Sequence, residues 1–240
     1  MKPACLPIFA IASVALVVGC DDRPRPPEDD RITLNERVIE GGEGTKVKAE
    51  IWVDNWFSMT INGQPLIEDS VAYKTERSFN AERVTFLADF PMTVAFEFRD
   101  FMENDTGLEY IGSNRQQIGD GGAIAQFINV DTGATIAVTD KSWKCTVTHH
   151  APIDADCARE DDPVIGEGSC AARISEAPVG WQGRDFDDGG WTAASVHSTD
   201  EVRPKDGYDE IEWAADAKLI WSEDLKLDNI VLCRTTIEAQ

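Results

Sequence analysis

The chain has 240 residues, of which 44 are Asp or Glu and 22 are Lys or Arg, so its formal net charge at pH 7 is −22. This length suits one large domain or two small ones. So acidic a surface repels phosphate backbones and argues against nucleic-acid binding, whereas it suits solubility, cation binding or a basic partner.

The first nineteen residues are predicted to be an export signal. Lys2 precedes an apolar run from Leu6 to Val18, and this run is shorter than a membrane span and ends at an acidic pair. Its last residues, Val17-Val18-Gly19-Cys20, resemble the lipobox of bacterial lipoproteins. The resemblance implies cleavage before Cys20 and acylation of that residue, which would anchor the protein to a membrane. The alternative is an ordinary secretory signal in which Cys20 is a chance thiol.

Residues 20–31 are predicted to be a tether. The stretch from Asp21 to Arg31 consists of charged residues and proline, with no apolar side chain to bury. Removal of residues 1–19 takes away Lys2 and no acidic residue, so the mature charge becomes −23. One domain over residues 32–240 is the simplest organisation.

From residue 32 onward the pattern predicts β-structure. Predicted strands cover residues 47–53, 56–61, 71–73, 84–87, 93–98, 123–128, 135–138, 143–148, 219–221 and 230–237. Asn62-Gly63 lies between apolar runs and predicts a hairpin, because both residues tolerate positive φ. Short strands at this density, without a long helical period, indicate an all-β sandwich or barrel.

Four cysteines remain beyond the leader and Cys20, and in an exported domain they suggest two disulfides. Three pairings are possible. Cys157 and Cys170 bracket an acidic loop, which favours their pairing and would then join Cys145 to Cys233. Zinc binding is disfavoured, because the spacings match no zinc pattern.

Several segments resemble the galactose-binding-like jelly-roll domains that accompany many glycoside hydrolases. They are AEIWVDNWFSMTING (residues 49–63), DKSWK (140–144), GWQGRDFDDGGWTAA (180–194) and IWSEDLKLDNIVLCR (220–234). The resemblance implies a jelly-roll β-sandwich. Because the last segment normally comes first, it also implies a circular rearrangement. It does not by itself imply sugar binding, since one sandwich hosts many functions.

A second, vaguer resemblance covers residues 68–80, 104–112 and 119–127. These stretches look like the region ahead of phosphatidylethanolamine-binding-like domains in some exported bacterial proteins. Since 240 residues leave no room for that second domain, the chain would be the accessory part alone.

The candidate ligand-binding residues are Trp56, Asp54 and Asn55. An exposed tryptophan can stack on a sugar face, although tryptophans also fill cores. Weak candidates for a structural calcium ion are Asn104, Asp105 and Glu109, because calcium takes carboxylate and carbonyl oxygens from loops. The alternative is a solvated acidic loop.

No catalytic motif stands out. A nucleophile elbow of the G-x-S-x-G type is absent, and the adjacent His149 and His150 should point to opposite faces of a strand. We therefore expect a non-catalytic envelope lipoprotein that is exported, lipid-anchored and able to bind carbohydrate. The alternatives are an envelope lipoprotein that binds another protein and, least favoured, an uncharacterised hydrolase.

Overall fold

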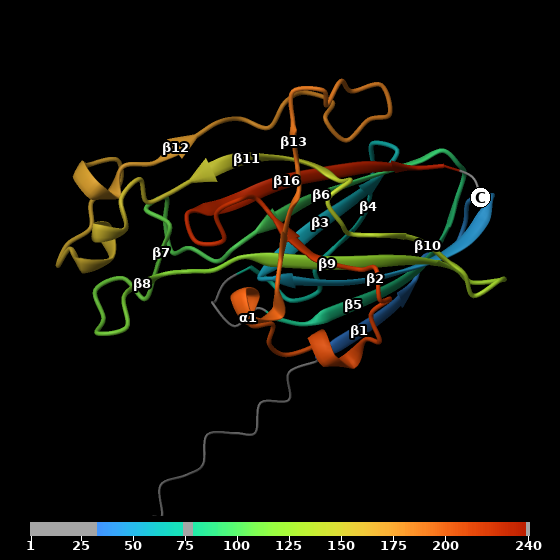
Figure 1. The fold of residues 1–240 in the computed structure, drawn as a ribbon, viewed down its shortest axis with the longest axis horizontal. Coiled ribbons are helices and arrows are strands. Elements are labelled where there is room, and N and C mark those ends of the chain that lie inside the picture. The colour runs from blue at the N-terminus through green and yellow to red at the C-terminus, as the bar shows by residue number, and fades with distance from the viewer. Residues whose placement is uncertain (1–32, 74–78, 239–240) are drawn as a thin grey trace, which may run out of the picture. The chain divides into compact units, whose positions relative to one another are not determined.

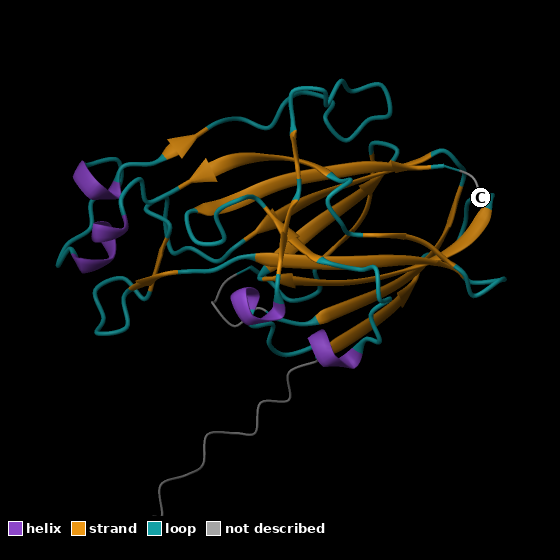
Figure 2. Cartoon of the chain, in the orientation of Figure 1, coloured by secondary structure: helices purple, strands orange, loops and turns teal. Residues whose placement is uncertain are grey.

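Two β-sheets packed face to face form the described part of the chain, residues 33–73 and 79–238, in a computed structural model (Figures 1 and 2). The predicted all-β sandwich is confirmed at this level. The predicted signal peptide (residues 1–19), Cys20 and the tether (residues 20–31) lie outside the described residues.

The first sheet has the strand order β1-β5-β2-β9-β15-β14, with β10 paired to β9. Its strands are β1 (Leu34–Val38), β2 (Thr45–Asp54), β5 (Ala81–Ala88), β9 (Gly122–Asn129), β10 (Thr135–Val138), β14 (Ser195–His197) and β15 (Leu219–Trp221). Neighbours pair antiparallel, except that β1 runs parallel to β5.

The second sheet has the strand order β12-β11-β16-β6-β3-β4, with β13 paired to β11. Its strands are β3 (Trp56–Ile61), β4 (Gln64–Glu68), β6 (Met92–Arg99), β11 (Lys144–His150), β12 (Arg173–Ile174), β13 (Thr192–Ala193) and β16 (Asp228–Ile237). The remaining elements are the β7–β8 pair (Leu108–Glu109, Gln117–Ile118), the helix α1 (Thr199–Val202) and the 3-10 turns η1 (Ala155–Arg159), η2 (Gly168–Cys170) and η3 (Tyr208–Glu210).

Strand β2 shows how the sequence builds the core. Its alternate residues Val47, Ala49, Ile51 and Val53 are fully buried, in one cluster with the aromatic side chains of the second sheet. Because successive strand residues point to opposite faces, Trp52 faces outward, where it packs with Phe79 and Val202. The segment around α1 therefore covers the outer face of the first sheet.

Most predicted strands are present, and the Asn62-Gly63 hairpin turn joins β3 to β4 with positive φ at both residues. The strand predicted at residues 71–73 is wrong: the chain bends there after Asp69, whose Oδ1 accepts the Val71 N–H at 2.8 Å. Such an Asx turn competes with strand pairing. Strand β1 was not predicted, because only two of its five residues are apolar, and β4 was not predicted, because it contains Pro65 and proline is depleted in strands.

Two disulfides are present, and both have the pairing favoured from the sequence. Cys157–Cys170 closes the loop that carries η1 and η2. Cys145–Cys233 joins residues directly opposite each other on β11 and β16, inside the core. Disulfides are typical of proteins that fold in an oxidising compartment.

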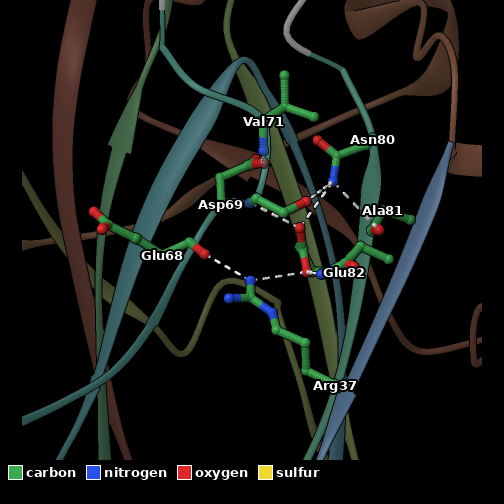
Figure 3. Close-up of polar contacts among 9 residues, drawn as sticks. Arg37, Glu68, Asp69, Val71, Asn80, Ala81 and Glu82 are labelled. Carbon is green, nitrogen blue, oxygen red and sulfur yellow. Dashed lines mark hydrogen bonds and ion pairs between the residues drawn. The ribbon is translucent and has the colours of Figure 1, made fainter. Parts of the chain in front are cut away.

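The fully buried carboxylate of Glu82 ties β1 and β5 to the bend after β4 (Figure 3). Its Oε2 accepts hydrogen bonds from Asn35 Nδ2 at 2.7 Å and Arg37 Nη2 at 3.0 Å. Its Oε1 accepts from the backbone N–H of Ser70 and from Asn80 Nδ2, both at 2.9 Å. Four donors thus satisfy one buried charge, and they compensate for its removal from water.

Many of the buried polar residues lie at one end of the sandwich, which we call the loop end. The register pairs Asp54 with Gly122, Trp56 with Arg99, and His150 with Asp228, so these strand ends meet there. The loop end comprises residues 54–56, 69–73, 79–81, 99–122, 150–175, 199–210 and 222–229, and it includes β7 and β8 at the left of Figure 1. Buried polar residues at this end include Asp54, Asn55, Asp69, Asn80, Asp100, Asp228 and Asn229.

Candidate functional site at the loop end

Three depressions lie side by side at the loop end; polar atoms line most of the surface of the first two, and apolar atoms line slightly more than half of the third. The cationic pocket, of about 300 Å³, is lined by Gln117, Ile118, Gly119, Asp120, Arg203, Lys205 and Lys226. The acidic depression, of about 560 Å³, is lined by His197, Glu201, Glu223, Asp224, Leu225, Lys226 and Asp228. The histidine depression, of about 520 Å³, is lined by Val147, His150, Ala172, Arg173, Ile174, Ser175 and Asp228. Because Lys226 borders the first two and Asp228 the last two, we treat them together as the loop-end groove.

Local hydrogen bonds shape the segments that present the cations of this groove. A capping box between Ser198 and Glu201 starts α1, and Arg203 ends it in the left-handed conformation, with φ of 51°. In the β15–β16 connection, Asp224 Oδ1 accepts the N–H groups of Lys226 and Leu227 at 2.9 and 3.1 Å. Both turns therefore follow from short-range side-chain caps.

Two glycines allow the β8–β9 loop to lie close to the interior. A Cβ atom on Gly119 would come within 2.4 Å of an Asp100 carboxyl oxygen, and one on Gly121 would come within 2.4 Å of the Trp221 ring. The loop can therefore bring Asp120 to the rim of the cationic pocket only with glycine on either side.

Buried carboxyl groups lie beneath the cationic pocket. Asp54 and Asp100 are each 1% exposed, and neither oxygen of Asp100 has a hydrogen-bond partner among the described residues. Lys205 Nζ lies 3.9 Å from Asp54 Oδ2 and 3.9 Å from Asp120 Oδ1. Burial, followed by the charges of Asp54, Glu109 and Asp120, raises the pKa of Asp100 well above its usual range. Burial also raises the pKa of Asp54, which Lys205 partly offsets.

These carboxyl groups predict that the fold is more stable at mildly acidic than at alkaline pH. Burial also raises the pKa of Asp69 to about 8. A carboxyl group whose pKa is raised on folding stabilises the fold fully below its unfolded pKa, and this contribution is lost as the pH rises through the folded pKa. We expect the free energy of unfolding to fall between pH 5 and 8, by up to about 1.4 kcal/mol per pH unit for each such group.

Urea denaturation across this pH range measures the effect. Asp100→Asn should flatten the slope, whereas the exposed turn residue Asp131, changed to Asn, should leave it as in the parent protein. Equal slopes for the parent and Asp100→Asn would contradict the assignment.

The adjacent histidines of β11 have different acidic neighbours, and the pairing of β11 with β16 is irregular at both residues. His150 Nδ1 is 2.6 Å from Asp228 Oδ1 at the histidine depression. His149 is 2% exposed, and its burial lowers its pKa, although Asp105 lies 3.7 Å from its Nε2. The two rings therefore lie in different surroundings, one buried and one at the histidine depression.

The predicted ligand-binding residues do not line the loop-end groove. Asp54 and Asn55 are each 1% exposed, and Asn55 Oδ1 accepts the Phe101 N–H at 2.5 Å. Trp56 is half-buried, with the Arg99 guanidinium 5.2 Å from its ring centroid. Asp54 and Asn55 are thus buried rather than presented to a ligand, because the chain turns inward at Asp54 as it passes from the first sheet to the second. A ligand role for Trp56 stays a prediction.

The predicted calcium residues are engaged by different neighbours. Asn104 Oδ1 accepts hydrogen bonds from both the N–H and the hydroxyl of Thr106, and Glu109 Oε2 accepts from Gln117 Nε2 at 2.7 Å. Asp105 lies beside His149. Within residues 33–73 and 79–238, no three His, Cys, Asp or Glu side chains are arranged to hold a metal ion. The structure therefore offers no support for the predicted calcium ion.

Four groups of the groove were not predicted from the sequence: Arg203, Lys205, Lys226 and the His150–Asp228 pair. The segment between Trp221 and Asp228, which contains acidic residues and lysine, belongs to one of the jelly-roll-like stretches, and no site was predicted there. The only local indication of a turn in this segment is Asp224, because an Asp two residues before Lys226 has the spacing of an Asx turn. Nothing local predicts that this turn meets the segment after α1.

No protein-family model, curated protein or solved structure matches this chain. In the part of the chain that the structure describes, no helix is long and apolar enough to cross a membrane.

Proposed function

We propose that this protein is an exported, lipid-anchored binding module of the cell envelope that holds an extended polar ligand of the carbohydrate class in the loop-end groove. The observation that carries the proposal is the adjacency of two mainly polar depressions, the cationic pocket and the acidic depression, which share Lys226 and continue into the histidine depression at Asp228. Sites for drug-like molecules are lined mainly by apolar and aromatic side chains. A groove in which carboxylates and cations alternate suits a ligand rich in hydroxyl groups, because a hydroxyl can donate to a carboxylate and accept from a cation.

Export and anchoring are supported by two independent features. The lipobox-like sequence ending at Cys20 would attach acyl chains and tether the domain through residues 20–31. The two disulfides are typical of a chain that folds outside the cytoplasm. The resemblance to galactose-binding-like jelly rolls is compatible with a sandwich that binds its ligand at one end, and the proposed role is non-catalytic.

Lys226→Ala is expected to weaken glycan binding by about tenfold or more, because this side chain borders two of the three depressions and charged hydrogen bonds contribute about 1.5–3 kcal/mol. A glycan array identifies the ligand, and calorimetry on the purified protein measures the affinity. The control is Lys141→Ala, an exposed cation that precedes β11 at the opposite end of the sandwich.

Trp56→Ala distinguishes the groove from the site predicted by sequence. Loss of binding on Trp56→Ala, with full binding by Lys226→Ala, would place the ligand outside the groove and refute the proposal.

A second candidate function is binding to another envelope protein. It is favoured by apolar side chains left exposed on and beside the Cys157–Cys170 loop: Ile153 (38%), Val164 (45%), Ile165 (51%) and Ile174 (57%). This function would be favoured if no glycan on an array bound the protein and if a pull-down recovered one envelope protein in a fixed stoichiometric ratio.

A further inference from the structure

The cationic pocket concentrates positive charge on a strongly acidic protein. Three of its seven lining residues are cationic, although Lys and Arg make up only 22 of the 240 residues. Asp120 is its one carboxylate. The pocket therefore differs in sign from most of the surface, and it can attract a negative group.

Within residues 33–73 and 79–238, two of its three cations have no side-chain partner. Lys205 lies over the Phe79 ring at 4.5 Å and forms ion pairs with Asp54 and Asp120. The side chains of Arg203 and Lys226 make no hydrogen bond or ion pair with any residue that the structure describes, and both are exposed. Their charges remain available for a ligand.

The neighbouring acidic depression limits the kind of anion that fits. Glu201, Glu223 and Asp224 line it beside Lys226, so a densely charged polyanion crossing the groove would meet like charges. These carboxylates can instead accept hydrogen bonds from hydroxyl groups. The groove thus matches a ligand with an isolated negative group next to a stretch of hydroxyls.

We infer that the cationic pocket binds the carboxylate of an acidic saccharide, a hexuronate unit held by Arg203 and Lys226, while the adjoining sugars lie over the acidic depression. This inference rests on the proposed carbohydrate function. A planar carboxylate matches the two parallel N–H groups of a guanidinium, and Lys226, which lines the same pocket, adds a point charge.

Calorimetry with oligosaccharides that carry a single hexuronate unit among neutral sugars, and with their carboxyl-reduced, neutral counterparts, tests the inference on the purified protein. We expect the acidic form to bind at least about tenfold more tightly than the neutral form at low salt, and the difference to shrink as salt screens the charges. Arg203→Gln should remove most of the preference, so that the acidic and neutral forms bind with similar affinity. Lys141→Gln, with the same change in net charge at the other end of the sandwich, should retain the preference. Thermal melting confirms that each variant is folded.

The outcomes separate this inference from the proposed function. If the acidic and neutral forms bind with equal affinity, and Lys226→Ala weakens both, the uronate assignment is refuted but the proposed function as a binding module is not. A preference for the acidic form that survives Arg203→Gln would also refute it. Absence of binding to every saccharide would refute both.

Discussion

Replacing Cys145 and Cys233 together by Ala is expected to lower the free energy of unfolding by about 4–5 kcal/mol. The disulfide closes a loop with a sequence separation of 88, and loop-closure entropy of the unfolded chain gives about this value. Both residues are also buried in the main core, so the truncated side chains forfeit packing there. Domains have a free energy of unfolding of only about 5–15 kcal/mol, so this loss would remove a large part of the stability of the fold.

Denaturation in urea measures this effect, with the other disulfide as the matched comparison. Replacing Cys157 and Cys170 by Ala opens a loop with a separation of only 13, so about 3 kcal/mol is expected. A smaller loss for the Cys145/Cys233 variant than for the Cys157/Cys170 variant would contradict the argument from loop length.

Glu82→Gln is expected to destabilise the protein by about 3–5 kcal/mol, the range for breaking a buried charge pair. The carboxylate receives two donors on each oxygen (Figure 3). An amide keeps one acceptor oxygen and turns its NH₂ group toward two of these donors, so hydrogen bonds become repulsive contacts and Arg37 loses its counter-ion. The loss should loosen β1 from β5, because Asn35 and Arg37 belong to β1.

Hydrogen exchange of the β1 and β5 amides, together with urea denaturation, measures this change. The control is Glu36→Gln, whose exposed carboxylate lies 3.7 Å from Arg83 Nη1 and should contribute less than about 1 kcal/mol. Equal effects of the two substitutions would show that the burial of Glu82 does not govern its contribution.

The pattern of strands was readable from the sequence because side-chain alternation is local. The residues of β2 and β6 carry their period-two signal within eight to ten positions, β9 is a short apolar run, and Asn62-Gly63 specifies its own turn. Cysteine spacing favoured the disulfide pairing, since the short acidic loop between Cys157 and Cys170 leaves the other two cysteines to each other.

The candidate site was decided by tertiary structure alone. Asp120 and Lys205 are 85 positions apart, yet they meet within 3.9 Å because β2 pairs with β9 at the loop end and α1 covers that sheet. Conversely, Asp54 and Asn55, which the sequence offered as ligand-binding candidates beside Trp56, are buried where the chain changes sheets. Local periodicity determines which residues form strands, whereas burial and charge pairing depend on which distant segments come together, and a single sequence does not encode that information locally.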